Sequence, residues 1–286
     1  AITRARTDAP TLGSRPARAA IGSLVANDRN EEALAIVIDE LQHGSPYDPE
    51  LALAGVRLVV AAGKAADLRA VLESISTLED AGKVLSPIHP DGDLALRPDA
   101  TLDTARAEIA FIAANAMAVS DDRSADSHDL YRLALSFDPE HAMAANNLGY
   151  TLLEEERELA EAASLLELAF RLEPNDPNII DSIGWLRYQQ GIIDDISNSD
   201  GSITEGAITL LERAVLVDAS GGSPVSIDHY GDALWAGGQK ESAIDQWAHA
   251  LATLERRMSE FAALGRSDPE HPALLASLES KLTAAR

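Results

Sequence analysis

Three stretches of this chain can be superimposed in sequence, and this repetition constrains its fold more than any other feature. The stretches are Ala142–Pro174, Pro177–Ala219 and Pro224–Leu254. Each contains a helical pattern with a glycine on its second turn, a polar break, and a second helical pattern built on small residues. Because one helix pair cannot bury its apolar face alone, a period of about 34 residues predicts a stack of two-helix units. Stacks of this kind bind along their concave surface, so the repetition favours binding over catalysis.

The composition is that of a helical, acidic protein. Of the 286 residues, 46% are hydrophobic and only 4% aromatic, as closely packed helix pairs require. Its 47 acidic and 23 basic side chains give a net charge of −24, which repels nucleic acid and anionic lipid and favours basic partners or plain solubility. The lack of cysteine excludes disulfides, thiolate metal sites and cysteine nucleophiles. No transmembrane segment is expected, because the best apolar run, Leu51–Ala62, is too short and contains Arg57.

Breaks rich in proline and glycine organise the rest of the chain. Residues 1–18 contain four Arg and two Pro, without apolar periodicity, and predict a flexible basic leader. Residues 80–100 contain three Pro and two Gly and predict a loop. Asp48-Pro49-Glu50 is typical of a helix start. The helices predicted before the repeats are 19–27, 31–42, 49–62, 65–78, 101–119 and 125–136. The other predicted segments are degenerate helix pairs over 19–79 and 101–139, clear repeats over 142–254, and capping helices over 255–286.

The second repeat carries an insertion. Gly149 and Gly184 are 35 residues apart (184 − 149), whereas Gly184 and Gly231 are 47 apart (231 − 184). The extra length lies at 192–203, between the two helices of the pair, and we expect a polar loop there.

These repeats resemble the tetratricopeptide repeat (TPR) family. The family motif asks for large apolar, Gly or Ala, and Pro residues at fixed positions, and the matching residues are Leu148, Gly149, Leu152, Ala162, Leu166, Ala169 and Pro174; then Ile180, Ile183, Gly184, Ala207, Leu211, Ala214 and Ala219; then Ile227, Tyr230, Gly231, Leu234, Ala243, Trp247 and Ala250. The resemblance implies an all-α, right-handed superhelical solenoid of antiparallel helix pairs with C-terminal capping helices. The match departs from the motif at Ala145, at Arg187 and in the missing proline after the third repeat.

The second and third repeats are also similar to a narrower group of bacterial cell-envelope TPR proteins, often lipoproteins. Some members of that group are adaptors of periplasmic carboxyl-terminal processing proteases. The resemblance implies a periplasmic or cell-envelope location rather than a cytoplasmic one. The chain begins at Ala1 without an initiator Met, so we expect a processed or shortened start, and an upstream lipid anchor is compatible with it.

In TPR proteins the first helix of each pair lines the concave groove, and the resemblance implies a stripe of partner-binding residues. They are Asn146, Tyr150 and Leu153; Asp181, Trp185 and Tyr188; and Asp228, Asp232 and Trp235. Their i, i+4, i+7 spacing places each set on one helix face. Aromatic rings at such positions suit a peptide, and the Asp residues suit its Lys or Arg. The alternative interpretation is that Trp185 and Trp235 pack against a neighbouring helix. Trp247 is expected in the core.

No motif for chemistry is present. Asn198-Ser199-Asp200-Gly201 is similar to part of a calcium loop, but the register places Ile196 and Ala207 where acids are required. The seven His lack metal-binding spacing, and no phosphate-binding or nucleophile motif occurs. The sequence therefore predicts no enzyme, no metal and no cofactor. It predicts a scaffold or adaptor that binds a basic or apolar protein segment, and the alternative is a structural subunit whose TPR faces are buried in an assembly of undetermined size.

Overall fold

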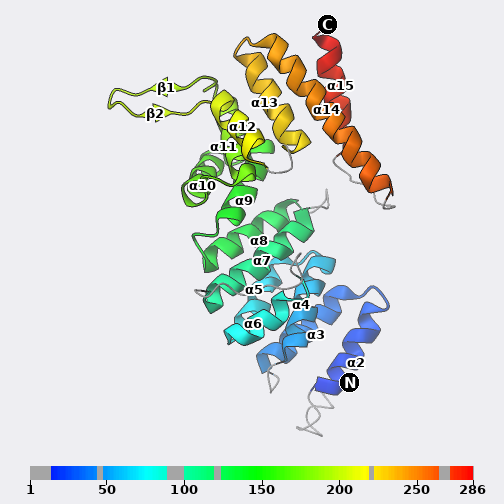
Figure 1. Ribbon diagram of the computed structural model, residues 1–286. Coiled ribbons are helices and arrows are strands. Elements are labelled where there is room, and N and C mark those ends of the chain that lie inside the picture. Colours follow the sequence, from blue (N-terminus) through cyan, green and yellow to red (C-terminus); the bar gives the residue numbers. More distant parts are fainter. Residues whose placement is uncertain are drawn as a thin grey trace. The chain divides into compact units, whose positions relative to one another are not determined.

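The computed structural model describes residues 14–43, 48–88, 100–118, 124–218, 222–263 and 271–285. They are almost entirely helical and divide into two compact units, Ala1–Ala144 and Ala145–Arg286 (Figure 1). Within each unit, most helices pack against the next one along the chain. The predicted fold class, an all-α solenoid of helix pairs, is confirmed.

The first unit is built from short helices around an aliphatic core. They are α2 (Ser14–Val25), α3 (Asn30–His43), α4 (Pro49–Ala62), α5 (Ala65–Ser74), α6 (Leu78–Leu85), α7 (Leu102–Ala118) and α8 (Ser124–Phe137). Asp48 caps α4 as expected, because its side chain accepts a hydrogen bond from the Glu50 amide. Leu34, Leu72 and Ile109 are fully buried in this unit.

Two predictions for this unit are wrong in part. The leader predicted over 1–18 gives way to helix α2 at Ser14, and residues 1–13 lie outside the described residues. The loop predicted over 80–100 begins as helix α6, because Thr77 caps that helix by accepting from the Asp80 amide at 3.1 Å. Residues 89–99 of the predicted loop also lie outside the described residues.

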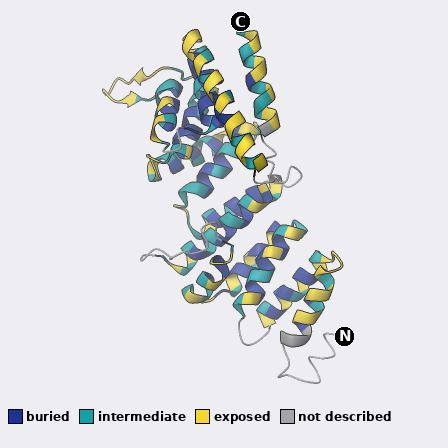
Figure 2. Ribbon diagram, turned by 45° about the vertical axis from the view of Figure 1, so that its right-hand side comes forward, coloured by how far each residue is buried: buried dark blue, intermediate teal, exposed yellow. Residues whose placement is uncertain are grey.

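The second unit contains the three clear repeats. Its elements are α9 (Ala142–Glu154, whose first turn belongs to the first unit), α10 (Leu159–Leu172), α11 (Pro177–Gln189), β1 (Ile196–Ser197), β2 (Ile203–Thr204), α12 (Ala207–Val217), α13 (Pro224–Ala236), α14 (Lys240–Ala263) and α15 (His271–Ala284). Figure 2 shows buried residues where these helices face one another and exposed residues on their outer sides. The long α14 and the following α15 form the predicted C-terminal cap, with Leu278 of α15 fully buried.

The repeat glycines set the distance between the helices of each hairpin. A methyl group added at any of them meets the large apolar residue that the repeat places on the second helix. The pairs are Gly149 with Leu166 at 2.9 Å, Gly184 with Leu211 at 2.8 Å, and Gly231 with Trp247 at 2.5 Å. These distances are too short for carbon atoms in contact, so each hairpin depends on the missing side chain. Trp247 is 4% exposed, which confirms its predicted place in the core.

The insertion in the second repeat, predicted as a polar loop, contains a short β-hairpin. Strands β1 and β2 are antiparallel, with Ile196 opposite Thr204 and Ser197 opposite Ile203. Figure 1 shows the hairpin extending away from α11 and α12. At its base the Asp195 carboxylate accepts from the Gly206 amide at 2.9 Å, and this bond lowers the pKa of Asp195. Ile203 is 64% exposed, so the hairpin adds little to the core of its unit.

Candidate functional site

The residues of the predicted stripe lie on α9, α11 and α13, and the structure divides them by burial. Tyr150, Trp185, Tyr188, Asp232 and Trp235 are partly exposed. Asn146, Leu153, Asp181 and Asp228 are buried, at 4%, 6%, 7% and 6% exposure. The partly exposed side chains are therefore the ones available to a partner without rearrangement of the helices.

Trp185 is the centre of an aromatic stack on α11. Its ring lies 4.7 Å from Tyr188 at an interplanar angle of 10°, and 4.0 Å from His229 of α13 at 13°. Tyr150 of α9 approaches the same His229 ring at 6.4 Å. We call Tyr150, Trp185 and Tyr188 the aromatic surface. Three repeats thus contribute one ring or more to a single cluster.

Carboxylates hold this cluster in place. Trp185 Nε1 donates to Glu154 Oε1 at 2.6 Å, and His229 Nδ1 lies 3.2 Å from both carboxylate oxygens of Asp181. Burial works to lower the pKa of His229, but the charge and hydrogen bond of Asp181, with the charges of Asp228 and Glu154, outweigh it and raise that pKa. The indole and imidazole are thereby fixed in one orientation.

The acidic residues of α13 have a partner within the chain. Lys281 of α15 places Nζ 2.7 Å from Asp228 and 2.7 Å from Asp232, and it lies 5.7 Å from the ring centroid of Trp247. Trp247 Nε1 donates to Asp232 at 3.0 Å. Burial raises the pKa of Asp228, and Lys281 opposes that effect. Asp228 and Asp232 were predicted to pair with a lysine or arginine of a partner protein. In the structure they pair with Lys281 of the same chain.

Trp235 lies at the end of the same helix. Its ring is 5.3 Å from Trp247 and 4.9 Å from the Lys240 ammonium. Trp235 packs against the buried cluster around Trp247, so the packing interpretation accounts for part of its surface.

Asn146 carries an unsatisfied group at the α9 end of the stripe. Its Nδ2 donates to Asn147 Oδ1 at 3.2 Å, whereas its Oδ1 is buried and has no hydrogen-bond partner among the described residues. A buried acceptor of this kind costs free energy unless a donor reaches it.

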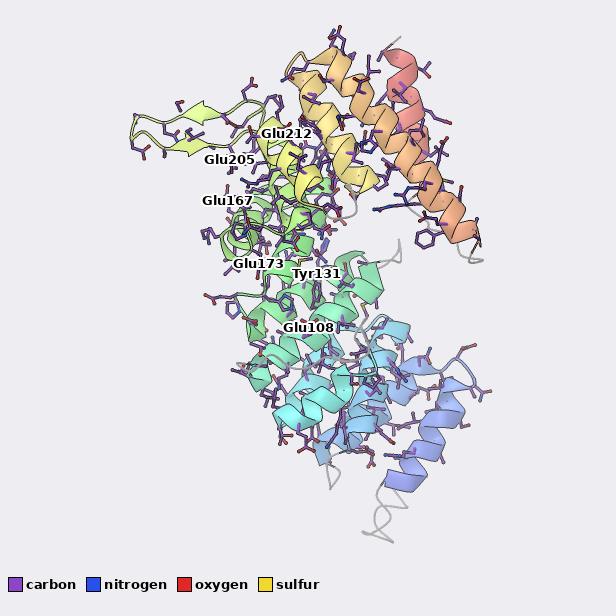
Figure 3. All side chains as sticks on the ribbon, in the orientation of Figure 1. Glu108, Tyr131, Glu167, Glu173, Glu205 and Glu212 are labelled. Carbon is purple, nitrogen blue, oxygen red and sulfur yellow. The ribbon has the colours of Figure 1, made fainter. Side chains whose placement is uncertain are left out.

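Other acidic side chains of this unit, among them Glu167, Glu205 and Glu212 in Figure 3, pair with residues of neighbouring segments. Arg187 donates to Glu167 at 2.5 Å, Arg213 donates to Glu205 at 2.7 Å, and Tyr230 donates to Glu212 at 3.3 Å. Burial and then the Glu212 carboxylate raise the pKa of Tyr230 to about 12. Arg187, the departure from the repeat motif, is thus accommodated by an ion pair.

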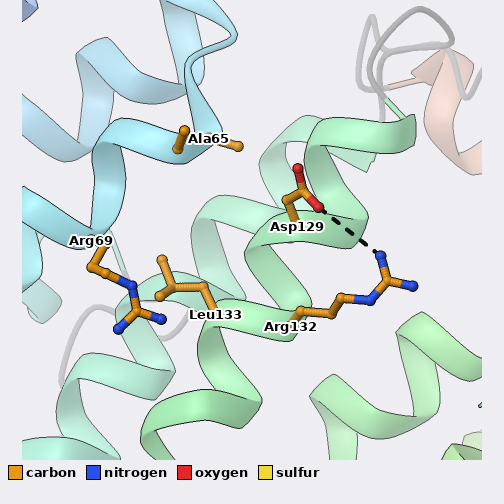
Figure 4. A pocket seen from close by; sticks show the side chains of 6 residues that line it. Ala65, Arg69, Asp129, Arg132 and Leu133 are labelled. Carbon is orange, nitrogen blue, oxygen red and sulfur yellow. Dashed lines mark ion pairs between the residues drawn. The ribbon is translucent and has the colours of Figure 1, made fainter.

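A separate pocket of about 270 Å³ lies between α5 and α8 of the first unit (Figure 4). Its lining residues are Ala65, Ala66, Arg69, Asp129, Arg132 and Leu133. Arg69 donates to Ser136 at 3.0 Å, and Arg132 pairs with Asp129 at 4.0 Å. Because both guanidinium groups have neighbours and the pocket is open, we assign it no ligand.

Sequence reasoning missed two contributors to the site. Glu154 was not singled out, although it lies exposed at the end of α9 and accepts a hydrogen bond from the Trp185 indole. Lys281 was not singled out, although leucines at 274, 275, 278 and 282 mark an apolar face beside it.

The described part of the chain contains no group of three or more His, Cys, Asp or Glu residues placed to hold a metal ion. Within that same part, no helix has the length and apolar character needed to cross a membrane.

Comparison with known proteins supports the repeat assignment. A 64-residue segment is 44% identical to a TPR repeat-containing protein of Pseudomonas aeruginosa, and the match covers 22% of this chain and 11% of that protein. The crystal structure of MamA aligns over 77% of this chain and 95% of its own, with a TM-score of 0.32 and 17% identity. No protein-family model matches the chain. With the glycine-spaced hairpins, the sequence match supports the TPR resemblance of the repeats, and stacked repeats of this type present extended surfaces that suit protein binding. The comparisons do not identify the narrower envelope group.

Proposed function

We propose that this protein is a non-catalytic scaffold that binds a basic or apolar segment of a partner protein across the aromatic surface of its second unit. The observation that carries the proposal is the stack of Tyr188, Trp185 and His229, in which the two partly exposed rings of α11 rest on a buried imidazole and carboxylates hold Trp185 and His229. Large rings fixed before binding lose little entropy when a partner packs on them, and such rings dominate binding energy at protein interfaces.

The chemistry around the stack favours a partner with basic or hydrogen-bond donor groups. Glu154 is exposed beside Trp185, and the chain carries a net charge of −24. Since Lys281 already occupies Asp228 and Asp232, we restrict the proposed site to the residues contributed by α9 and α11.

The test is a matched pair of variants expressed with a tag in the source organism and crosslinked in the living cells. In Tyr150→Ala/Tyr188→Ala the aromatic surface loses its two tyrosines. Phe170→Ala is the control, because Phe170 is a partly buried aromatic residue on α10 that lies under Arg213. We expect partner recovery to fall about tenfold or more in the double variant and to be kept in the control. Equal recovery by two variants with matching circular dichroism melts would contradict the proposal.

The resemblance of the second and third repeats to envelope TPR proteins extends the proposal to a periplasmic adaptor of a processing protease. Cell fractionation of the tagged native protein tests the location. Recovery in the cytoplasmic fraction alone would remove this extension and leave the scaffold proposal in place.

A further inference from the structure

Helix α15 binds its own unit in the way that an amphipathic ligand helix binds a groove. Leu278 is fully buried in the cluster that contains Trp247 and Leu254, and Leu274, Leu275 and Leu282 pack against that cluster. We call the surface formed by Asp228, Asp232, Trp247 and Leu254 the α15 site. Its occupant presents leucines at positions i, i+1, i+4 and i+8 and a lysine at i+7, which is one face of a helix.

The α15 site requires a cation. The side chains of Asp228 and Asp232 are 9% and 15% exposed, and that of Lys281 is 24% exposed. Two carboxylates this close and this well buried repel one another when no cation lies between them. The ammonium of Lys281 also lies over the Trp247 ring, which adds a cation–π contact. An occupant of the right shape that lacks the cation leaves Asp228 without its ion pair and leaves Asp232 with only the Trp247 indole as a partner.

The present occupant is lightly held. Among the residues of α15 whose burial is described, Leu278 alone is buried, whereas α10, α11, α12, α13 and α14 each bury three or more. Local opening is easiest where the fewest apolar contacts are lost. Release of α15 therefore costs less than release of any of those five helices, and it leaves their hairpins intact.

We infer that the α15 site is a second protein-binding surface, and that its partner is an amphipathic helix with a lysine one turn beyond its central leucine, which displaces α15. The inference builds on the proposed scaffold function by naming the chemistry of a partner segment. It concerns different residues from the aromatic surface, so each claim is testable without the other. To displace α15, a partner helix must bind the site more favourably than α15 does with its Lys281 ion pairs.

The probe is a synthetic peptide with the sequence of residues 271–285, and the control peptide carries Lys281→Glu. Binding is measured by fluorescence anisotropy against the full chain and against the full chain with Lys281→Glu. We expect the lysine peptide to bind the Lys281→Glu chain about tenfold or more tightly than the wild-type chain, because that chain's own helix no longer neutralises the acids. The glutamate peptide is expected to bind neither chain.

Displacement is measured separately with a thiol. The chain has no cysteine, so Leu278→Cys introduces the only one, at the buried centre of α15. We expect the lysine peptide to increase the rate of thiol labelling saturably, and Leu278→Cys/Lys281→Glu to label about tenfold faster than Leu278→Cys without peptide.

Three outcomes overturn the inference. The first is that the lysine peptide binds neither chain, and the second is that the lysine and glutamate peptides bind equally. The third is that light scattering shows concentration-dependent dimers that exclude the peptide, which would assign the site to a second copy of this chain. If the peptide binds while Tyr150→Ala/Tyr188→Ala still captures its partner, the aromatic proposal fails and this one stands. If the peptide does not bind and Tyr150→Ala/Tyr188→Ala loses its partner, this inference fails and the aromatic proposal stands.

Discussion

Helices α11 and α13 carry the same stripe positions with opposite consequences. Each begins its stripe with a buried aspartate, Asp181 or Asp228, and each aspartate faces a cationic or protonatable group. The partner of Asp181 is His229, on a helix in the middle of the unit, whereas the partner of Asp228 is Lys281, on the lightly buried α15. One repeat position thus gives a fixed surface in the first case and an exchangeable one in the second. The difference follows from the helix that supplies the group facing the aspartate, α13 for Asp181 and α15 for Asp228.

The largest effect that tests this contrast is expected from His229→Ala. The change removes the ring against which Trp185 stacks and leaves Asp181 buried without its partner. We expect the free energy of unfolding to fall by about 3 kcal/mol, the lower end of the range for a broken buried pair. Urea unfolding followed by circular dichroism measures it. His249→Ala, on the exposed face of α14, is the control and should change stability by less than about 0.5 kcal/mol. Similar losses in both would mean that Asp181 does not depend on His229.

The two hairpins also differ in how they tolerate a methyl group at the repeat glycine. In Gly231→Ala the methyl lies 2.5 Å from the rigid indole of Trp247, and in Gly184→Ala it lies 2.8 Å from the branched Leu211. We expect about 2 kcal/mol of destabilisation for Gly231→Ala and about 1 kcal/mol for Gly184→Ala, since leucine can change rotamer. Gly22→Ala, with no atom within 4 Å, is the control and should be neutral or stabilising. Thermal unfolding ranks the three, and a reversed order for the first two contradicts the packing argument.

A pH titration tests the buried pair of His229 and Asp181. The pKa of His229 is raised above the unfolded value of 6.5, so its contribution to stability is full below that value and is lost as pH rises through the raised pKa. Each unit of elevation is worth about 1.4 kcal/mol. The groups facing His229 are Asp181, Asp228, Glu154 and the neighbouring rings. The stability difference between the wild type and His229→Gln, measured by unfolding from pH 6 upward, should shrink as the pH rises, and a constant difference would contradict the assignment.

The sequence predicts the parts of this structure that follow from local patterns. Repeat glycines opposite large residues, and the Asp48-Pro49 helix start, are visible in short windows because they reflect helix packing and capping. Helix α6 had such a signal as well, in Thr77 and Asp80, but the prolines and glycines that follow obscured it. The β-hairpin was signalled only weakly, by β-branched residues in two very short runs and by Asp200-Gly201 between them.

The site was harder to predict because its contacts join residues distant in sequence. Lys281 and Asp228 are 53 positions apart, and His229 and Asp181 are 48 apart. The family pattern indicated which residues share a helix face, and it placed Asp181, Trp185 and Tyr188 correctly on one side of α11. It carried no information on which other element covers that face. Only the structure could therefore show that four of the nine stripe residues are buried.

The smallest expected effect tests how loosely α15 is held. Lys281→Met keeps the length and apolar stem of the side chain and removes only its charge, so Asp228 and Asp232 lose their shared partner. We expect about 1 kcal/mol of destabilisation confined to α15, because opening that helix exposes both acids to water and relieves their repulsion without unfolding the hairpins. Amide hydrogen exchange measures it as faster exchange across 271–284 with unchanged protection in α13. Arg256→Met, which breaks the exposed pair with Glu260, is the matched control and should leave both helices as they are. If protection falls equally in α13 and α15, then α15 is an integral part of the third repeat, and the difference between the fixed and the exchangeable surface disappears.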